Sequence, residues 1–80
     1  MPEVFRIFGM RFFFYSNEHL PIHIHVQNAN GKAKFRVTPT IKLIDNKGFK
    51  PSEIKLAEGI IEENKVVIIK AWETFHGTIN

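Results

Sequence analysis

The sequence contains no cysteine among its 80 residues. Disulfide bonds and thiolate metal sites are therefore excluded, and histidine and carboxylate side chains remain as the candidate metal ligands. Long apolar stretches are missing as well, since the longest runs, residues 12–15 and 66–69, are far shorter than the roughly 20 residues of a membrane helix. The first residues show no basic segment followed by an apolar core and a cleavage site. We therefore expect no signal peptide, no membrane partner and a cytoplasmic location.

The chain also lacks internal repeats, low-complexity tracts and linkers. Its length suits one hydrophobic core, so we expect a single domain over residues 1–80. A formal net charge of +3 allows an anionic partner without requiring one. Domains of this size are marginally stable alone, and many gain stability by forming oligomers or by binding a partner.

Histidine, by contrast, is concentrated in one stretch, because His19, His23 and His25 are three of the four in the chain. Apolar and imidazole side chains alternate strictly from Ile22 to Val26, a pattern typical of a strand. Alternate side chains of a strand lie on the same face, so His23 and His25 should lie roughly 7 Å apart along one face. The sequence thus predicts a strand with one apolar face and one face of nitrogen donors.

Four other segments have strand character: residues 4–8, 10–15, 32–37 and 41–45. Gly9 indicates a hairpin or a bulge between the first two. The third segment alternates apolar and basic residues, and pairing it with the histidine strand would place Lys34 and Arg36 on the histidine face. The second segment carries aromatic side chains in succession, which favours a central strand, with a partly exposed aromatic platform as the alternative.

Two helices are expected in the second half of the sequence. Pro51 suits the first position of a helix, although Lys50 at the cap position lacks an acceptor side chain. Asn64 suits the cap of a second helix that ends at His76, and one unbroken helix would be about 39 Å long, awkward in so small a domain. The β-branched run at 66–69 could equally form a strand if taken alone. We predict an α+β fold, with an antiparallel sheet of four or five strands over residues 3–45 and two helices over residues 51–76 packed on one face.

Four motifs resemble one known family in their order and spacing. They are Met-Pro-x-Val-x-Arg-Ile at 1–7, Arg-Phe-Phe-Phe-Tyr-Ser-Asn at 11–17, Glu-His-x-Pro-x-His-x-His-Val at 18–26 and Trp-x-x-Phe-His-Gly at 72–77. Together they resemble the bacterial family catalogued as domain of unknown function 4160. The chain departs from the family pattern at Leu20 and Ile22, where many members have proline, at Lys50, commonly serine, and at Val66 and Val67, commonly acidic. These departures weaken both helix caps and add apolar surface.

The resemblance implies a small cytoplasmic protein often encoded beside another short protein, an arrangement similar to toxin–antitoxin modules. We accordingly predict a partner-binding component of such a module, with the histidine face as its working site. The apolar run at 66–69 and the aromatic second strand would suit a homo-oligomer or a small cognate partner protein. An ordinary covered core position is the alternative for any single one of these residues.

A His-x-His pair on a strand can also offer two nitrogens to one metal ion. His19 or His76 would supply a third ligand, and Glu18 would be a fourth ligand or the base that activates a metal-bound water. Zinc fits imidazole ligands, and nickel and copper are alternatives. Solvated or hydrogen-bonded surface histidines without a metal are the structural alternative.

Cleavage of RNA without a metal is a further alternative. One of His23 and His25 would take a proton from a ribose hydroxyl while the other donates a proton to the leaving oxygen. Lys34 or Arg36 would stabilise the negative charge on phosphate, and Tyr15 would hold an unstacked base. The sequence leaves open the choice between this chemistry, a metal site and partner binding.

Overall fold

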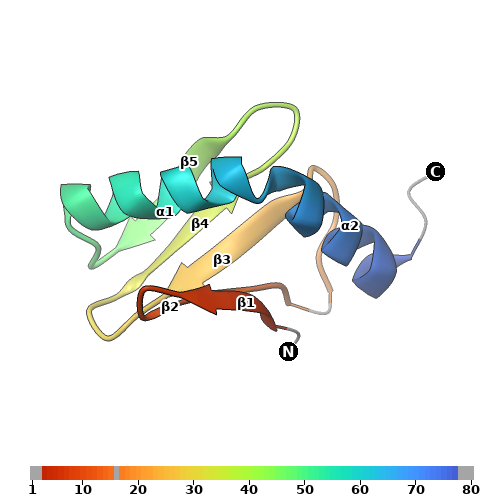
Figure 1. Cartoon of the computed structure of the whole chain (residues 1–80). Coiled ribbons are helices and arrows are strands. Elements are labelled where there is room, and N and C mark those ends of the chain that lie inside the picture. The colour runs from red at the N-terminus through yellow and green to blue at the C-terminus, as the bar shows by residue number, and fades with distance from the viewer. Residues whose placement is uncertain (1–2, 16, 78–80) are drawn as a thin grey trace.

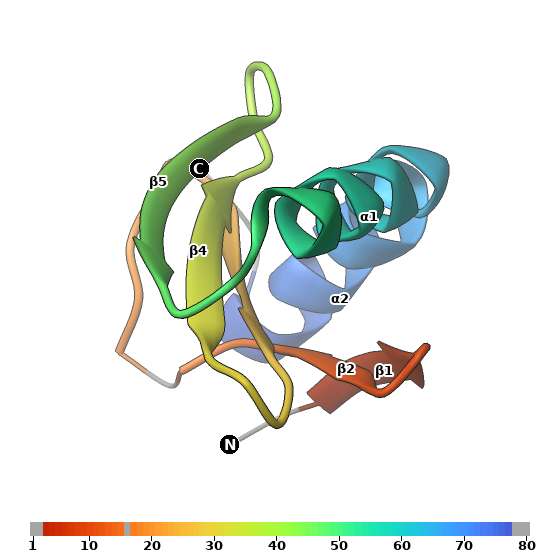
Figure 2. The same cartoon turned by 90° about the vertical axis from the view of Figure 1, so that its left-hand side faces the viewer.

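Five antiparallel strands followed by two helices make up the fold (Figure 1). A computed structural model describes residues 3–15 and 17–77. The elements are β1 (Glu3–Ile7), β2 (Met10–Phe13), β3 (His23–Gln27), β4 (Lys32–Arg36), β5 (Lys42–Lys47), α1 (Pro51–Glu63) and α2 (Lys65–His76). The strands form one sheet in the order β1-β2-β3-β4-β5, and both helices lie on the same side of it (Figure 2). The predicted α+β fold is confirmed.

The central strands bury one face under the helices. Ile24 and Val26 of β3 and Phe35 of β4 are fully buried, whereas the residues between them point to the other side of the sheet. This alternation follows from the two-residue period of a strand and is the pattern predicted from the sequence. The helices complete the core with Ala57, Ile60, Ile61, Ile68 and Trp72. Neither helix in the described part of the chain is long and apolar enough to cross a membrane.

The aromatic run at 12–15 is divided between the two faces. Phe12 and Phe14 join the core, while Phe13 is buried on the opposite side, where the Arg11 guanidinium lies 4.4 Å from its ring centroid. Tyr15 is 43% exposed. The burial expected of a central strand is therefore found at residues 12–14. The strand itself ends at Phe13, earlier than predicted, because Phe13 is the last residue of β2 that pairs with β3.

Turn geometry sets the ends of the outer strands. The β1–β2 hairpin turns at Phe8 and Gly9, whose φ angles of 53° and 74° are both positive, as a two-residue loop of type I′ requires. Gly9 therefore marks a hairpin. The strand predicted at 41–45 instead begins at Lys42 and runs to Lys47, because its last residues still pair with β4. A shift in the β4–β5 register near Lys34 leaves Ile44 exposed in an irregular part of the ladder.

The two helices meet at Asn64, and the predicted division into two helices is confirmed. Asn64 occupies the predicted cap position of α2, where its carbonyl oxygen accepts the N–H of Ile68 at 2.9 Å, but its side chain makes no capping hydrogen bond. Its side-chain amide instead donates to the carbonyl oxygen of Ile60 in α1, at 2.8 Å. The explanation is that one residue separates the helices, so the Asn64 backbone still continues α1, its N–H donating to the carbonyls of Ile60 and Ile61.

Glu53 compensates for the missing capping side chain at the start of α1. Its carboxylate accepts a hydrogen bond from the backbone N–H of Lys50, at 2.8 Å, which is half of a capping box. The same carboxylate accepts from the side-chain amides of Asn28 and Asn30, at 2.7 and 3.0 Å. Glu53 therefore ties the beginning of α1 to the loop between β3 and β4.

Candidate metal centre

Polar side chains of β3 and β4 lie together on the side of the sheet that the helices leave open. We call this surface, formed by His23, His25, Lys32, Lys34 and Arg36, the open face. In the antiparallel ladder His23 pairs with Arg36 and His25 pairs with Lys34. Directly paired residues point to the same side of a sheet, so the predicted placement of both cations beside the histidines is confirmed.

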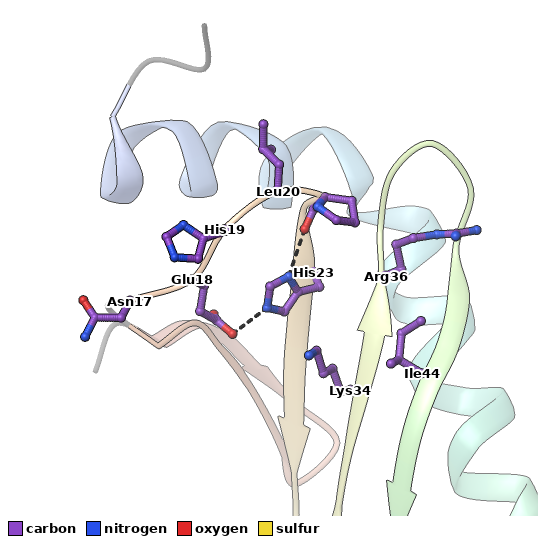
Figure 3. Close-up of a pocket in the computed structure, with 9 residues that line it drawn as sticks. Asn17, Glu18, His19, Leu20, His23, Lys34, Arg36 and Ile44 are labelled. Atoms are coloured by element: carbon purple, nitrogen blue, oxygen red, sulfur yellow. Dashed lines mark hydrogen bonds and ion pairs between the residues drawn. The ribbon is translucent and has the colours of Figure 1, made fainter.

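Glu18 reaches the open face from the segment that joins β2 to β3. Its Oε1 accepts the backbone N–H of Tyr15 at 2.8 Å, which fixes the carboxylate. Its Oε2 lies 2.6 Å from Nε2 of His23 and 2.5 Å from Nε2 of His25. The three side chains are only 9%, 12% and 16% exposed, respectively. One carboxylate oxygen is thus shared by two imidazoles in a largely buried position (Figure 3 shows the Glu18–His23 bond).

The second ring nitrogen of His23 is also held in place. Nδ1 lies 2.9 Å from the backbone carbonyl oxygen of Pro21, which can only accept, so Nδ1 carries the proton (Figure 3). A histidine that ligates a metal through one nitrogen commonly donates the other N–H to a carbonyl or carboxylate, which fixes the ring. His23 therefore presents Nε2 toward Glu18 in the orientation that a metal ligand needs.

The environment of the cluster shifts the pKa values of two of its members. Burial alone would raise the pKa of Glu18, but hydrogen bonds from His25, the Tyr15 backbone and His23 outweigh it, so the pKa lies below its ordinary value. Burial lowers the pKa of His25, assisted by the charges of His23 and Lys34, although Glu18 acts in the opposite direction. Glu18 is therefore ionised and His25 neutral at neutral pH, and these are the forms that bind a metal ion.

Aromatic rings enclose both imidazoles. The ring of His25 lies between Tyr15 and Phe13, with centroid separations of 4.5 and 5.5 Å. The ring of His23 packs against Trp72 of α2, with centroids 5.3 Å apart. These contacts limit rotation of the imidazoles and explain their low exposure. The cluster is therefore held by the fold and not by its own hydrogen bonds alone.

The structure separates the predicted site residues into two groups. Glu18, His23 and His25 converge, and their ligand atoms all lie within 4.8 Å of one another. His19 and His76 lie outside that group: His19 is exposed beside the larger pocket, and Nε2 of His76 lies 3.1 Å from the Tyr15 carbonyl oxygen. The third converging ligand is thus the carboxylate, and not one of the two other histidines.

Sequence reasoning missed two contributors to the site. The carbonyl of Pro21 orients His23, and Trp72, assigned only to the core, packs on the same ring. A backbone carbonyl leaves no signal in a sequence. The position of Glu18, just ahead of the histidine strand, was a usable signal for a shared site, because a short loop can fold back onto the strand that follows it.

Two pockets flank the cluster on the open face. The larger, with a volume of about 440 Å³, is lined in part by Glu18, His23, Lys34 and Arg36 (Figure 3). The smaller, of about 160 Å³, is lined in part by Tyr15, His25, Lys32, Lys34 and Lys47. Lys34 lines both pockets, so one cation lies between them next to the histidines.

Fold and site together define a small α+β protein with a glutamate–histidine cluster on the open face of its sheet. The chain belongs to the family described as Domain of unknown function (DUF4160), whose model matches residues 9–73. The matched range includes Glu18, His23 and His25 and ends before His76. No curated protein and no solved structure matches the chain.

Proposed function

We propose that this chain is a metal-binding protein that holds one divalent transition metal ion through Glu18, His23 and His25. The observation that carries the proposal is the convergence of one carboxylate oxygen and two imidazole nitrogens within 4.8 Å of one another. Ligands about 2.0–2.1 Å from a tetrahedral zinc lie roughly 3.3 Å apart, so each imidazole nitrogen would move roughly 0.7–0.8 Å farther from the Glu18 oxygen to admit the ion. The bond from His23 Nδ1 to Pro21 supports the proposal because it holds the ring with Nε2 toward Glu18, where a metal ion would replace the proton that Nε2 donates to the carboxylate.

Three protein ligands leave at least one coordination position for another molecule. In zinc sites with two histidines and one glutamate, water or substrate occupies that position. The cluster borders the larger pocket, which gives such a molecule access. A bound ion would polarise it and lower the pKa of a bound water. Zinc is the first ion to test, and iron, nickel and copper also suit this ligand set.

Native mass spectrometry of the untagged protein with added zinc tests this proposal. We expect one zinc per chain in the wild type and loss of the ion in His25→Ala and Glu18→Gln. The matched control is His19→Ala, which removes a neighbouring imidazole outside the converging group and should retain the ion. Circular dichroism confirms that each variant is folded. Absence of bound zinc in the folded wild type, or equal loss in His19→Ala, would reject the site.

A second candidate function, partner binding, is favoured by exposed apolar residues at the start of α2. Val66 and Val67 are 68% and 53% exposed, although both are large aliphatic side chains. Burying such residues supplies the apolar centre of a protein interface. We propose that this surface contacts a second copy of the chain or a small cognate protein, as expected for one half of a toxin–antitoxin-like pair.

Sedimentation velocity over a range of concentrations tests the partner surface directly. If copies of the chain associate, Val67→Lys should shift the equilibrium to monomer by adding a charge at the centre of the contact. Thr74→Lys adds the same charge at another exposed position of α2 and should leave association unchanged. A wild-type protein that is monomeric throughout, and that binds no co-expressed neighbouring gene product, would contradict this second function.

Metal-free cleavage of RNA by His23 and His25 stays a prediction. Both Nε2 atoms bond to the same oxygen of Glu18, so proton transfer to a substrate would require Glu18 to release one ring. Labelled RNA incubated with the protein in a chelator separates the alternatives. Cleavage that persists in the chelator and disappears in His25→Ala would support acid–base chemistry, whereas cleavage that needs added zinc would assign it to the metal site.

A further inference from the structure

We infer that the open face binds a single strand of nucleic acid, with its phosphates along β4 and a base against Tyr15. This inference goes beyond the proposed metal site and does not depend on it. It rests on three features of the described residues: the separation of charge between sheet and helices, the spacing of the cations on β4, and an exposed aromatic ring beside them.

Charge is divided unequally between the two layers of the fold. Residues 3–47, which include the sheet, contain seven lysines and arginines against three acidic residues. Residues 51–76, which form the helices, contain three lysines against five glutamates. The modest net charge of the whole chain therefore hides a basic layer and an acidic layer. Such asymmetry is typical of proteins that bind a polyanion through one surface.

The cations of β4 form a row on the open face. Lys32, Lys34 and Arg36 alternate with Ala33 and Phe35, which are buried under the helices. Alternate residues of a strand lie roughly 6.6–6.8 Å apart, close to the separation of consecutive phosphates in an extended nucleic-acid strand. The row therefore has the spacing to contact successive phosphates, and it connects the two pockets.

The lysines of this row are available to a ligand. In the described part of the chain, Lys32, Lys34 and Lys47 form no ion pair with a carboxylate. Lys47 pairs with Lys32 across the ladder, which adds a third positive charge at the smaller pocket beside Lys32 and Lys34. Two acidic groups share this surface: Asp45, which faces Lys34 across the ladder, and Glu18, which bonds to the two histidines. Two directly opposed lysines repel each other, and a phosphate between them would relieve that repulsion.

Tyr15 supplies a surface for a base. Its ring is 43% exposed and lines the smaller pocket with Lys32 and Lys34. The edge-to-face contacts with His25 and Phe13, at centroid separations of 4.5 and 5.4 Å, hold the ring from the inner side. A base can stack on an aromatic side chain only when it has left its own stack, which favours a single strand over a duplex.

Filter binding of a labelled short oligouridylate in a chelator tests the inference independently of any metal. The test variant is Lys32→Gln combined with Lys34→Gln. The matched control is Lys55→Gln combined with Lys70→Gln, which removes the same charge from exposed positions on the helices. The logarithm of the binding constant falls with the logarithm of the salt concentration, and each lost phosphate contact should make that slope shallower by about 0.7. The slope of the test variant should therefore be shallower than that of the wild type by about 1.4, and the slope of the control should be unchanged.

Tyr15→Leu provides the second measurement, because it keeps the cations and removes the stacking surface. It should weaken binding roughly tenfold or more without changing the salt slope. The single variant Lys47→Gln, at an exposed position, keeps the test valid if the double variant unfolds. The inference is overturned if the wild type does not bind at low salt, if both double variants lose affinity equally, or if a duplex of the same sequence binds as tightly. Binding of a DNA strand with the same dependence on Lys34 and Tyr15 would support the shared phosphate and base contacts.

Discussion

The two faces of the sheet are made by alternate residues of the same strands, yet different forces hold them. On β4, Phe35 is fully buried against the helical layer, while its neighbours Lys34 and Arg36 lie on the open face. The covered face is stabilised by apolar burial, which is the dominant favourable term in folding. The open face is organised by hydrogen bonds around Glu18. Apolar burial on the covered face therefore supplies most of the stability of the fold, which leaves the open face available for binding.

Truncating a buried side chain on the covered face should have the largest effect on the stability of the protein. Phe35→Ala removes a fully buried ring and should lower the free energy of unfolding by about 3–5 kcal/mol. That is a large part of the roughly 5–15 kcal/mol typical of a folded domain. Urea unfolding followed by circular dichroism measures the change. Lys34→Ala, the adjacent residue on the open face, is the matched control and should stay within about 0.5 kcal/mol of the wild type. Similar losses in both variants would contradict the contrast between the faces.

Zinc should stabilise the protein through the open face alone. At a free zinc concentration of about 100 times the dissociation constant, a site present only in the folded state adds about 2.7 kcal/mol to the free energy of unfolding. This gain should vanish in His25→Ala and persist in His19→Ala, because the latter lies outside the converging ligands. Thermal unfolding with and without zinc measures it. An equal gain in His25→Ala would place the binding elsewhere.

The smallest expected effect on stability comes from replacing Glu53, whose carboxylate joins α1 to the β3–β4 loop. Hydrogen bonds from the Lys50 backbone and the Asn28 and Asn30 amides hold the pKa of Glu53 below its ordinary value of 4.5. The stabilisation is therefore complete above that ordinary value and is lost as the pH falls through the lowered pKa. Glu53→Gln should be less stable than the wild type at neutral pH, with the difference shrinking in acid.

Urea unfolding at a series of pH values measures this convergence. The exposed Glu62 of the same helix provides the control, since Glu62→Gln should change stability little at any pH. A constant difference between the wild type and Glu53→Gln from neutral to acidic pH would show that the ionised carboxylate is not the stabilising form.

Strict alternation of residue types made one part of the fold predictable. In β3 and β4 every second residue is apolar, and a shift of one residue would turn that set away from the helices. The register was therefore determined by the sequence, and with it the placement of Lys34 and Arg36 beside His23 and His25. The same argument predicted that the two histidines share a face, but it did not predict that the Glu18 carboxylate lies between them.

The features that could not be predicted from the sequence depended on the paths of loops and on competition between neighbouring hydrogen-bonding groups. Glu18 becomes the shared acceptor because its loop returns over β3; its position just ahead of the histidine strand indicated a shared site but did not specify the two contacts. Asn64 stands at the cap position of α2 as predicted, but its side-chain amide donates to the Ile60 carbonyl oxygen at the adjacent end of α1 and does not cap α2. Lys50 provides no capping side chain, as predicted; its backbone carbonyl accepts the N–H of Glu53, and the Glu53 carboxylate accepts the N–H of Lys50 in return.

Trp72 gives the protein a built-in optical reporter. It is the single tryptophan of the chain, and its ring lies 5.3 Å from that of His23 and 3.9 Å from that of His76. Indole emission is quenched by nearby paramagnetic ions such as copper. The emission of Trp72 would therefore report the binding of such an ion at the proposed site beside His23. Titrations of this site can be followed in the unlabelled wild-type chain, with no added chromophore.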